Sequence, residues 1–304
     1  MVVTHGSLRS ARGRSTLTIG NFDGVHRGHQ ALVERVVAKG RELGVTSCVL
    51  TFEPHPREFF AGDAAPPRLT RLHDKLELLA ADGVERVHLM HFNARLAAMS
   101  AARFIEDVLV RGLGVAWLLV GRDFRFGARR QGGFATLEDA ARRSGFALEA
   151  MPDVAFDGER VSSSAVRTAL AAGDFARAER LLGRPYTISG KVGPGARLGR
   201  ELGFPTANIA LAQRPPLGGI YVVEVEELGR GVASVGRRPT VNPVAKPLLE
   251  VHLFDWDGEL YGQRLRVRFL RKLRDEAKFD DLAALRRAIA QDAEQARQYF
   301  ARHG

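Results

Sequence analysis

A chain of 304 residues is long enough to form two domains, each with its own hydrophobic core. Its apolar fraction of 45% and charged fraction of 26% are typical of a soluble globular protein, and no apolar run reaches the roughly eighteen residues of a membrane-spanning helix. The net charge of +10 comes from 39 Arg and 6 Lys, which are scattered among Asp and Glu. No basic arm or aromatic-basic motif accompanies them, so we expect attraction to small phosphorylated molecules and no nucleic-acid partner.

The amino terminus and the single cysteine indicate the cellular compartment of the protein. Residues 1–15 lack the apolar segment of a secretory signal, and we expect them to form a flexible tail. Cys48 lies in an apolar run (CVLTF), which predicts a buried strand residue and excludes an internal disulfide. Together these features predict a cytoplasmic protein.

The first half is organised around residues 16–30 (TLTIGNFDGVHRGHQ). An apolar, β-favouring run predicts a strand, GNFDG predicts a turn, and an amphipathic helix is expected from about Gly28 to Leu43. Backbone N–H groups at such a helix start suit an anion. Gly28 would let a ligand approach the backbone closely between His26 and His29.

Two histidines three residues apart at a helix start are open to other interpretations. They could be surface or capping residues, or two ligands of a metal, although the sequence offers no convincing third or fourth ligand. The order of strand, turn, histidine pair and helix resembles the HxGH signature of nucleotidylyltransferases. The string GNFDGVHRGHQ is similar to the flavin-nucleotide branch of that group.

Strands and helices alternate from residue 16 to about residue 182. This pattern, with nearly continuous apolar strands, predicts a parallel sheet covered on both faces, in which ligands bind beyond the carboxyl ends of the strands. The expected strands are 17–20, 47–52, 84–92, 117–121 and 147–154, and the expected helices are 31–43, 73–81, 101–111 and 137–144.

Three further motifs stand at strand ends or at a helix start. EPHP (residues 53–56) is a turn stiffened by two prolines, and GRDFRFG (residues 121–127) carries two aromatics that are expected to pack. VSSSAVR (residues 161–167) opens a helix. Its hydroxyls are typical N-caps, but with Arg167 one turn on they could also hold a triphosphate.

The pattern changes at residue 183, where we expect a first domain over residues 16–183 to give way to a second over residues 184–304. Short β-rich runs without a helix until about residue 280 predict a small antiparallel barrel. The expected strands are 186–192, 220–226, 231–235, 248–255 and 265–269. A closing helix is expected over residues 281–300, with Leu282, Leu285, Ile289, Ala293, Ala296 and Phe300 on its packed side.

The barrel carries its own candidates for binding ATP. Thr206 and Asn208 would share one face of an extended strand and offer hard oxygen ligands to the Mg²⁺ of MgATP. Glu250 begins an alternating strand and is expected to face inward, as part of a structural ion pair or as a base with a raised pKa. A preceding glycine-rich loop could wrap phosphates, although hairpins also use glycine. Its glycines include Gly190, Gly195 and Gly199.

Over nearly its full length the chain resembles the bacterial bifunctional riboflavin kinase/FMN adenylyltransferases (FAD synthetases). The matching motifs are GNFDGVHRGH, TFEPHP, GRDFRFG, VSSSAVR, LGRPY, LGFPTAN, GRRPT, LEVHLFDWDGELYG and LRDEAKF. The resemblance implies an α/β fold: a Rossmann-like nucleotidylyltransferase domain with a parallel sheet, then a small antiparallel β-barrel riboflavin kinase domain with a C-terminal helix. Departures include Ser164, Ser234 and Val241, where the family often has Thr, Asn and Phe.

The resemblance implies two reactions in series, each consuming ATP. In the barrel, the 5′-hydroxyl of riboflavin would attack the γ-phosphate of MgATP, giving FMN. Glu250 would take the hydroxyl proton, Thr206 and Asn208 would hold the metal, and Arg274 would contact the flavin. The residues implied to bind ATP there are Gly190, Gly195, Gly199, Thr206 and Asn208.

In the first domain, the FMN phosphate would attack the α-phosphate of a second ATP, giving FAD and pyrophosphate. His26 and His29 would donate to the α- and β-phosphates, and catalysis would consist of alignment and charge neutralisation. The residues implied to bind ATP or phosphate are Gly20, Phe22, Asp23, Gly28, Asp123, Ser162, Ser164 and Arg167. Those implied to border the flavin are Pro54, His55 and Pro56.

Two other functions remain as alternatives. The first domain could adenylylate another mononucleotide, such as nicotinamide mononucleotide or phosphopantetheine, beside a passive barrel. The chain could instead be a basic RNA-binding protein with an inactive nucleotide fold, which would bind RNA with a steep salt dependence.

Overall fold

The computed structural model describes residues 1–6, 13–194, 203–237 and 247–303. Backbone contacts group the chain into two compact units. The first comprises Met1–Pro66 and Leu72–Ser162, and the second comprises Pro67–Arg71 and Ser163–Gly304. The units therefore divide the chain earlier than the change of sequence pattern at residue 183, because two short helices, α7 (Ser163–Ala171) and α8 (Phe175–Leu182), belong to the second unit.

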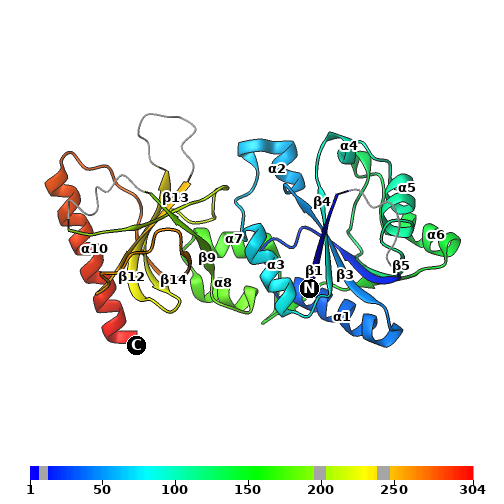
Figure 1. Ribbon diagram of the computed structural model, residues 1–304, viewed down its shortest axis with the longest axis horizontal. Helices are drawn as coiled ribbons and strands as arrows, with labels where there is room; N and C mark the ends of the chain where they lie inside the picture. Colours follow the sequence, from blue (N-terminus) through cyan, green and yellow to red (C-terminus); the bar gives the residue numbers. More distant parts are fainter. Residues whose placement is uncertain (7–12, 195–202, 238–246, 304) are drawn as a thin grey trace. The chain divides into compact units, whose positions relative to one another are not determined.

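The first unit is built on a six-stranded sheet in which every neighbouring pair is parallel, so the predicted parallel sheet is confirmed (Figure 1). The strand order is β1-β4-β3-β2-β5-β6. The strands are β1 (Val2–His5), β2 (Ser15–Ile19), β3 (Thr46–Glu53), β4 (Arg86–His91), β5 (Val115–Gly121) and β6 (Ala147–Met151). The helices are α1 (Arg27–Leu43), α2 (Pro56–Ala61), α3 (Leu72–Ala81), α4 (Ala94–Ala97), α5 (Ala101–Arg103), a π-helix (Phe104–Val110) and α6 (Phe134–Ser144).

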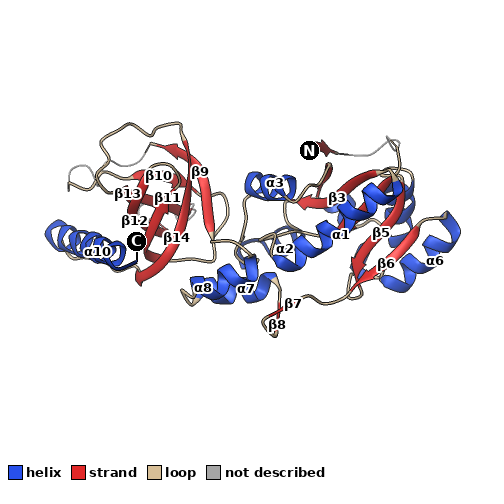
Figure 2. Ribbon diagram, turned by 90° about the horizontal axis from the view of Figure 1, so that it is seen from below, coloured by secondary structure: helices blue, strands red, loops and turns tan. Residues whose placement is uncertain are grey.

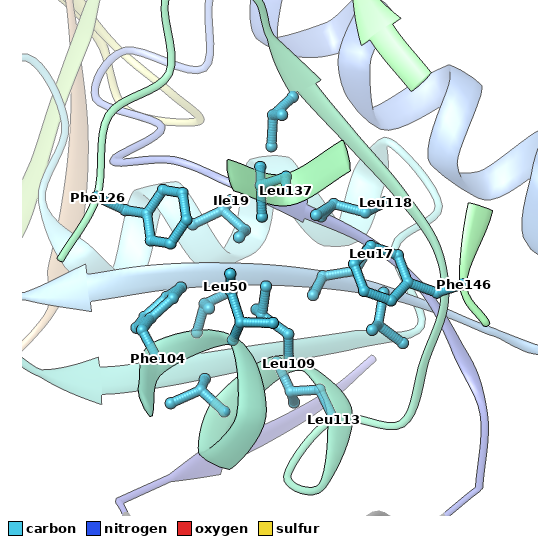
Figure 3. Close-up of a cluster of buried hydrophobic side chains, with 14 of the residues drawn as sticks. Leu17, Ile19, Leu50, Phe104, Leu109, Leu113, Leu118, Phe126, Leu137 and Phe146 are labelled. Carbon is cyan, nitrogen blue, oxygen red and sulfur yellow. The ribbon is translucent and has the colours of Figure 1, made fainter. Parts of the chain in front are cut away.

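Both faces of this sheet are buried, as the nearly continuous apolar strands predict. Successive residues of β5 point to opposite faces: Trp117 and Leu119 pack against Val36 of α1, whereas Leu118 belongs to a cluster on the other face. Figure 3 shows that cluster, whose side chains come from the strands, the π-helix, α6 and the segments between these elements. One of its aromatic residues, Phe126, is 7% exposed, so this aromatic of the GRDFRFG motif packs in the core as expected.

The expectation of a flexible tail over residues 1–15 is wrong for residues 2–5. These residues form β1, which extends the sheet by pairing in parallel with β4. A side-chain contact reinforces the pairing, since the Thr4 hydroxyl oxygen lies 2.9 Å from Nδ1 of the fully buried His88. Its other ring nitrogen lies 3.2 Å from the carbonyl oxygen of Gly6.

The second unit contains the predicted antiparallel barrel, which is closed in the order β10-β13-β12-β11-β14-β9 (Figure 2). The strands are β9 (Thr187–Gly193), β10 (Ala207–Ala210), β11 (Gly219–Val225), β12 (Gly229–Arg237), β13 (Pro247–Leu253) and β14 (Arg264–Arg274). The first unit also contains a separate antiparallel hairpin of two short strands, β7 (Ala155–Phe156) and β8 (Glu159–Arg160).

The closing helix α10 (Leu282–His303) packs on the outside of the barrel. Ala293, Ala296 and Phe300 are buried against Val222 of β11 and Val232 of β12, which confirms that end of the predicted stripe. At the other end of the stripe, Leu282 is 59% exposed and does not belong to the core. Among the described residues, no helix combines the length and apolarity needed to cross a membrane.

We predict that protonation of His88 couples the stability of the first unit to pH. Burial lowers the pKa of His88 below its ordinary value of 6.5, and the charges of His5 and Arg86 act in the same direction, against the hydrogen bond with Gly6. Because the unfolded chain takes up this proton below about pH 6.5 and the folded chain resists it, the free energy of unfolding should fall as pH drops from 7 to 5.

Thermal unfolding at pH 7.5 and 5.5 measures this effect. His88→Gln should show a smaller loss of stability between the two pH values than the unsubstituted chain, whereas His91→Gln, at the exposed end of the same strand, should match it. An unchanged pH dependence in His88→Gln would contradict the assignment.

Candidate active sites

The first candidate site lies where the strand order reverses in the parallel sheet. β2 pairs with β3 on one side and with β5 on the other, so the chain leaves β2 at the switch point of the sheet. Ligands of such sheets bind beyond the carboxyl ends of the strands at this point. GNFDG follows β2 there, EPHP begins at the end of β3, and GRDFRFG begins at the end of β5.

The turn after β2 holds unusual backbone conformations. Phe22 and Val25 have φ angles of 49° and 40°, which non-glycine residues rarely adopt and which cost about 1–3 kcal/mol each. Two side chains hold the turn: Nζ of the fully buried Lys75 donates to the carbonyl oxygen of Asn21 at 2.7 Å, and Nε2 of Gln30 donates to that of Val25 at 2.9 Å. Strain that is retained in this way is typical of a functional loop.

The two histidines lie side by side at the start of α1. Their rings are stacked with centroids 3.7 Å apart, and the backbone N–H of His29 donates to Nδ1 of the N-cap residue His26 at 3.3 Å. The ring of Phe22 lies 4.9 Å from that of His29. A Cβ on Gly28 would lie 3.3 Å from the His26 ring, so the glycine keeps this imidazole from being displaced. Two imidazoles at the positive end of a helix can donate to an anion.

Other predicted residues of the nucleotide site are distributed over both compact units. In the first unit, Asp23 is 2% exposed, whereas the Asp123 carboxylate is largely exposed, with its oxygen 3.7 Å from Nη2 of Arg160. Ser162 closes the first unit. The second unit begins with α7, which carries the remaining predicted residues, Ser164 and Arg167.

The EPHP turn begins α2 and places His55 at its N-cap. Nδ1 of His55 accepts from the backbone N–H of Arg57 at 3.0 Å, and the backbone N–H of His55 donates to the Glu58 carboxylate at 3.1 Å. This capping box gives His55 a structural role that needs no ligand.

Two aromatic residues of α2 were missed in the sequence, although the string REFF displays them. Phe59 and Phe60 are 41% and 70% exposed, and each contacts the ring of Phe92 edge-on, at 5.5 and 5.7 Å. Exposed aromatic rings near a loop of this kind can stack on a planar ligand.

The second candidate site follows one cross-strand row of the barrel. Asn208 on β10 is in register with Glu250 on β13, and Glu250 is in register with Ser234 on β12. The row continues through Ile220 to Arg274. Side chains directly opposite each other on antiparallel strands point to the same face and lie about 4.5–5.5 Å apart. The register thus brings together residues that are far apart in sequence.

The expectation that Glu250 faces inward is wrong. Its neighbours Leu249 and Val251 are 0% and 1% exposed and fill the barrel, so Glu250 must point to the outer face, where it is half-buried. The alternation of residues 248–253 predicts that Glu250 and its apolar neighbours point to opposite faces of the strand. Closure of the barrel then places the apolar neighbours inside and Glu250 outside. Asn208 is on the same outer face and is 7% exposed.

Arg274 ends the row and ties β14 to α10. Its Nε and Nη2 donate to the two carboxylate oxygens of Asp292 at 2.9 and 2.7 Å, and Asp292 is 4% exposed. A bidentate pair of this kind fixes the plane of the guanidinium. The predicted contact of Arg274 with a flavin would have to use the groups that this pair leaves accessible.

Glu276 is a second carboxylate near Glu250 that the sequence analysis did not single out, although it lies in LRDEAKF. Its carboxylate fills the place where a Cβ on Gly236 would stand. Burial raises the pKa of Glu276, and the charge of Glu250 raises it further, which places the two carboxyl groups within electrostatic reach.

The donor set expected for Mg²⁺ has suitable chemistry. Nδ2 of Asn208 donates to the carbonyl oxygen of Thr206 at 3.0 Å, which fixes the amide orientation, and both side chains carry the hard oxygen that Mg²⁺ prefers. Thr206 lines a cavity of about 550 Å³, whose other wall includes residues 256–261 of the FDWDGELYG string. Gly190 lies in β9, while Gly195 and Gly199 lie outside the described residues.

Comparison with known proteins decides the family. A family model described as FAD synthetase matches residues 8–165, and one described as riboflavin kinase matches residues 182–300. A bifunctional riboflavin kinase/FMN adenylyltransferase of Pseudomonas fluorescens is 51% identical over 295 residues, covering 96% of this chain and 94% of that protein. This chain belongs to the bifunctional riboflavin kinase/FMN adenylyltransferase family.

Other relatives agree with membership of the riboflavin kinase/FMN adenylyltransferase family. The protein of that name from Escherichia coli K12 is 46% identical over 301 residues, covering 97% of this chain and 96% of that protein. A solved structure, described as a macrolide-efflux protein from Streptococcus pneumoniae, has a TM-score of 0.79 at 27% identity and covers 98% of this chain and 99% of that one. The latter likeness supports the fold and carries no activity to this chain.

We predict that Trp256 reports nucleotide binding in the barrel cavity. Trp256 lines the cavity and is 37% exposed, whereas the other tryptophan, Trp117, is 3% exposed in the sheet core. Adding MgATP should therefore change the tryptophan fluorescence, and Trp256→Phe should abolish the change. A signal that persists in Trp256→Phe would place the responding site elsewhere.

Proposed function

We propose that this chain phosphorylates riboflavin to FMN and then transfers AMP from a second ATP to FMN, giving FAD and pyrophosphate. Phosphorylation would use the barrel row, and adenylyl transfer would use the histidine pair. We assign adenylyl transfer to residues 16–183 and phosphorylation to residues 184–304. The proposal rests on the presence of two separate clusters of polar side chains. One is the pair His26 and His29 at the helix start beside the switch point of the sheet, and the other is the barrel row that contains Asn208 and Glu250.

In adenylyl transfer, the chain would align two phosphates and neutralise the charge that develops between them. His26 and His29 would donate to the α- and β-phosphates of ATP from the start of α1, where the helix dipole also favours negative charge. Ser162, Ser164 and Arg167 would hold the departing pyrophosphate. No covalent intermediate with the protein is needed, because in-line attack by the FMN phosphate suffices.

The flavin of FMN would lie against the aromatic residues that follow the EPHP turn. The exposed rings of Phe59 and Phe60 stand edge to face, with an interplanar angle of 81°, so either ring would offer one apolar face to an isoalloxazine ring. Pro54 and Pro56 would border this surface, and Gly20, Phe22, Asp23 and Asp123 would shape the nucleotide side.

In phosphorylation, Glu250 would accept the proton of the riboflavin 5′-hydroxyl as its oxygen attacks the γ-phosphate of ATP. Asn208, in register with Glu250, and Thr206, beside the cavity, would hold Mg²⁺, which supplies charge neutralisation on the phosphates when bound. Arg274 would contact the flavin while Asp292 fixes its orientation.

We also propose the cytoplasm as the compartment of the protein. Its sole cysteine, Cys48, is fully buried in β3, and burial raises the pKa of its thiol to about 12, so the residue suits a reducing environment.

A time course with riboflavin and MgATP tests the overall proposal. FMN should appear first and then decline as FAD accumulates. Unchanged riboflavin beside turnover of another mononucleotide would instead favour an adenylyltransferase with a passive barrel.

We predict that His29→Ala abolishes FAD formation while FMN still accumulates. Removal of one donor to the developing charge typically lowers a rate by about 10²–10³, and the barrel residues are unchanged. Separation of flavin products after incubation with riboflavin and MgATP measures both steps. His303→Ala, an exposed histidine on α10, is the matched control. Equal loss of FMN and FAD in a folded His29→Ala variant would contradict separate sites.

We predict the opposite pattern for Glu250→Gln. The amide cannot accept the hydroxyl proton, so FMN synthesis from riboflavin should stop, whereas supplied FMN should still be converted to FAD. Glu224→Gln, which changes a half-buried glutamate of β11 that is paired with Arg268, should leave both steps unchanged. Normal FMN synthesis by Glu250→Gln would exclude Glu250 as the base.

A further inference from the structure

The short segment Pro67–Arg71 belongs to the second compact unit, although the chain before and after it belongs to the first. Within the second unit this segment is well anchored. The backbone N–H of Arg68 donates to the carbonyl oxygen of Arg214 at 2.9 Å, and the carbonyl oxygen of Pro67 accepts from Nε of Arg167 at 2.7 Å. Arg68, Leu69 and Thr70 are 6%, 2% and 7% exposed.

Arg71 contacts the barrel through its guanidinium. Nη1 of Arg71 donates to the carbonyl oxygen of Ser189 on β9 at 2.6 Å. Ser189 is 2% exposed, and its hydroxyl accepts from Nη1 of Arg264 at 3.0 Å. The hydrogen bond from Arg71 is partly buried and charge-assisted, and such a bond to the backbone is among the stronger interactions available to a strand.

Gly190 shows how closely Arg71 packs. A Cβ at position 190 would lie 2.5 Å from Nη1 of Arg71 and 2.3 Å from Cγ2 of Ile209 on β10. Both distances are too short for a real contact. The missing side chain of Gly190 therefore makes room for Arg71 and Ile209, which gives this glycine a packing role apart from any phosphate.

The contact lies beside the place where the barrel closes. β9 and β10 pair through two register pairs, Asn208 with Gly193 and Ile209 with Val192. We call these two pairs the seam. A short ladder is easily loosened, because few hydrogen bonds hold it. One of its four residues is Asn208, and Arg71 contacts β9 at Ser189, a few residues from the seam.

We infer that Arg71 is a positioning residue for riboflavin phosphorylation: by anchoring β9 at Ser189 it keeps the seam closed and holds Asn208 in place. Arg71 lies outside residues 182–300, which the riboflavin kinase model matches, so the kinase depends on a side chain from the amino-terminal half of the sequence. The inference rests on the proposed role of Asn208 in the kinase site.

The test compares Arg71→Met with Arg71→Lys in the full chain. Met keeps the length of the side chain but cannot donate a hydrogen bond, whereas Lys keeps the charge and one donor. Arg302→Met, on the exposed end of α10, is the matched control. The measured quantities are kcat and KM for MgATP and for riboflavin in FMN formation, the conversion of supplied FMN to FAD, and the thermal unfolding midpoint.

We expect Arg71→Met to lower kcat/KM for MgATP by about tenfold or more, since a misplaced binding group costs up to about a hundredfold. KM for MgATP should rise more than KM for riboflavin, because Asn208 is proposed to act on the metal. Arg71→Lys should recover most of the loss, and conversion of supplied FMN should stay within about twofold in every variant. Arg302→Met should match the unsubstituted chain.

Several outcomes would overturn the inference. One is an Arg71→Met variant with unchanged kinetics for MgATP, and another is an equal fall of both activities together with the unfolding midpoint. Asn208→Ala, measured in parallel, distinguishes failure of the proposed role of Asn208 from failure of the inference about Arg71. If Asn208→Ala still forms FMN normally, the proposed role of Asn208 fails. If Asn208→Ala loses FMN formation but Arg71→Met forms FMN normally, only the inference about Arg71 fails.

Gly190→Ala provides an independent check. Its added Cβ would displace Arg71, so it should reproduce the rise in KM for MgATP. In the double variant Gly190→Ala/Arg71→Met, the rise in KM for MgATP should be smaller than the product of the two single-variant factors, because both changes remove the same contact. Fully multiplicative effects would show that Gly190 and Arg71 act independently, against the inference.

Discussion

Parallel pairing of β2 with strands on both of its sides is the constraint on which the histidine site depends. In a parallel sheet all strands end at the same edge, so the loops after β2, β3 and β5 must meet there. The start of α1 follows directly from the loop after β2 and brings His26 and His29 to that edge. Because β2 is the strand at which the order reverses, loops on its two sides diverge and leave room for a ligand.

In the barrel, the placement of the polar residues follows from closure of the sheet. Closure forces alternate residues of every strand into an interior that must be apolar, so the polar residues between them are presented outside in rows. The row from Asn208 through Glu250 to Arg274 is one consequence. Its members lie on five different strands, and long stretches of sequence separate them, so strand register alone places them in one row.

In both units, cationic side chains hold neighbouring groups in place. Lys75 fixes the strained turn after β2 through Asn21, and Arg71 fixes β9 through Ser189. Arg274 plays a related part through the Asp292 carboxylate. Lys75 is fully buried, and a buried charge is costly unless it is paired or hydrogen-bonded, so its presence marks a position where the backbone has to be held firmly.

The sequence by itself determined the two fold classes, the strand–turn–helix arrangement of the histidine pair and the family. These properties depend on local periodicity, turn residues and contiguous motifs, which a linear string displays directly. The tertiary structure decided which face Glu250 takes, that residues 2–5 form a strand, that Phe59 and Phe60 are exposed together, and that Arg71 packs on β9. Each of these depends on which strands become neighbours and on how the barrel closes. Alternation along a strand is identical for both faces, so only the contacts made across space choose between them.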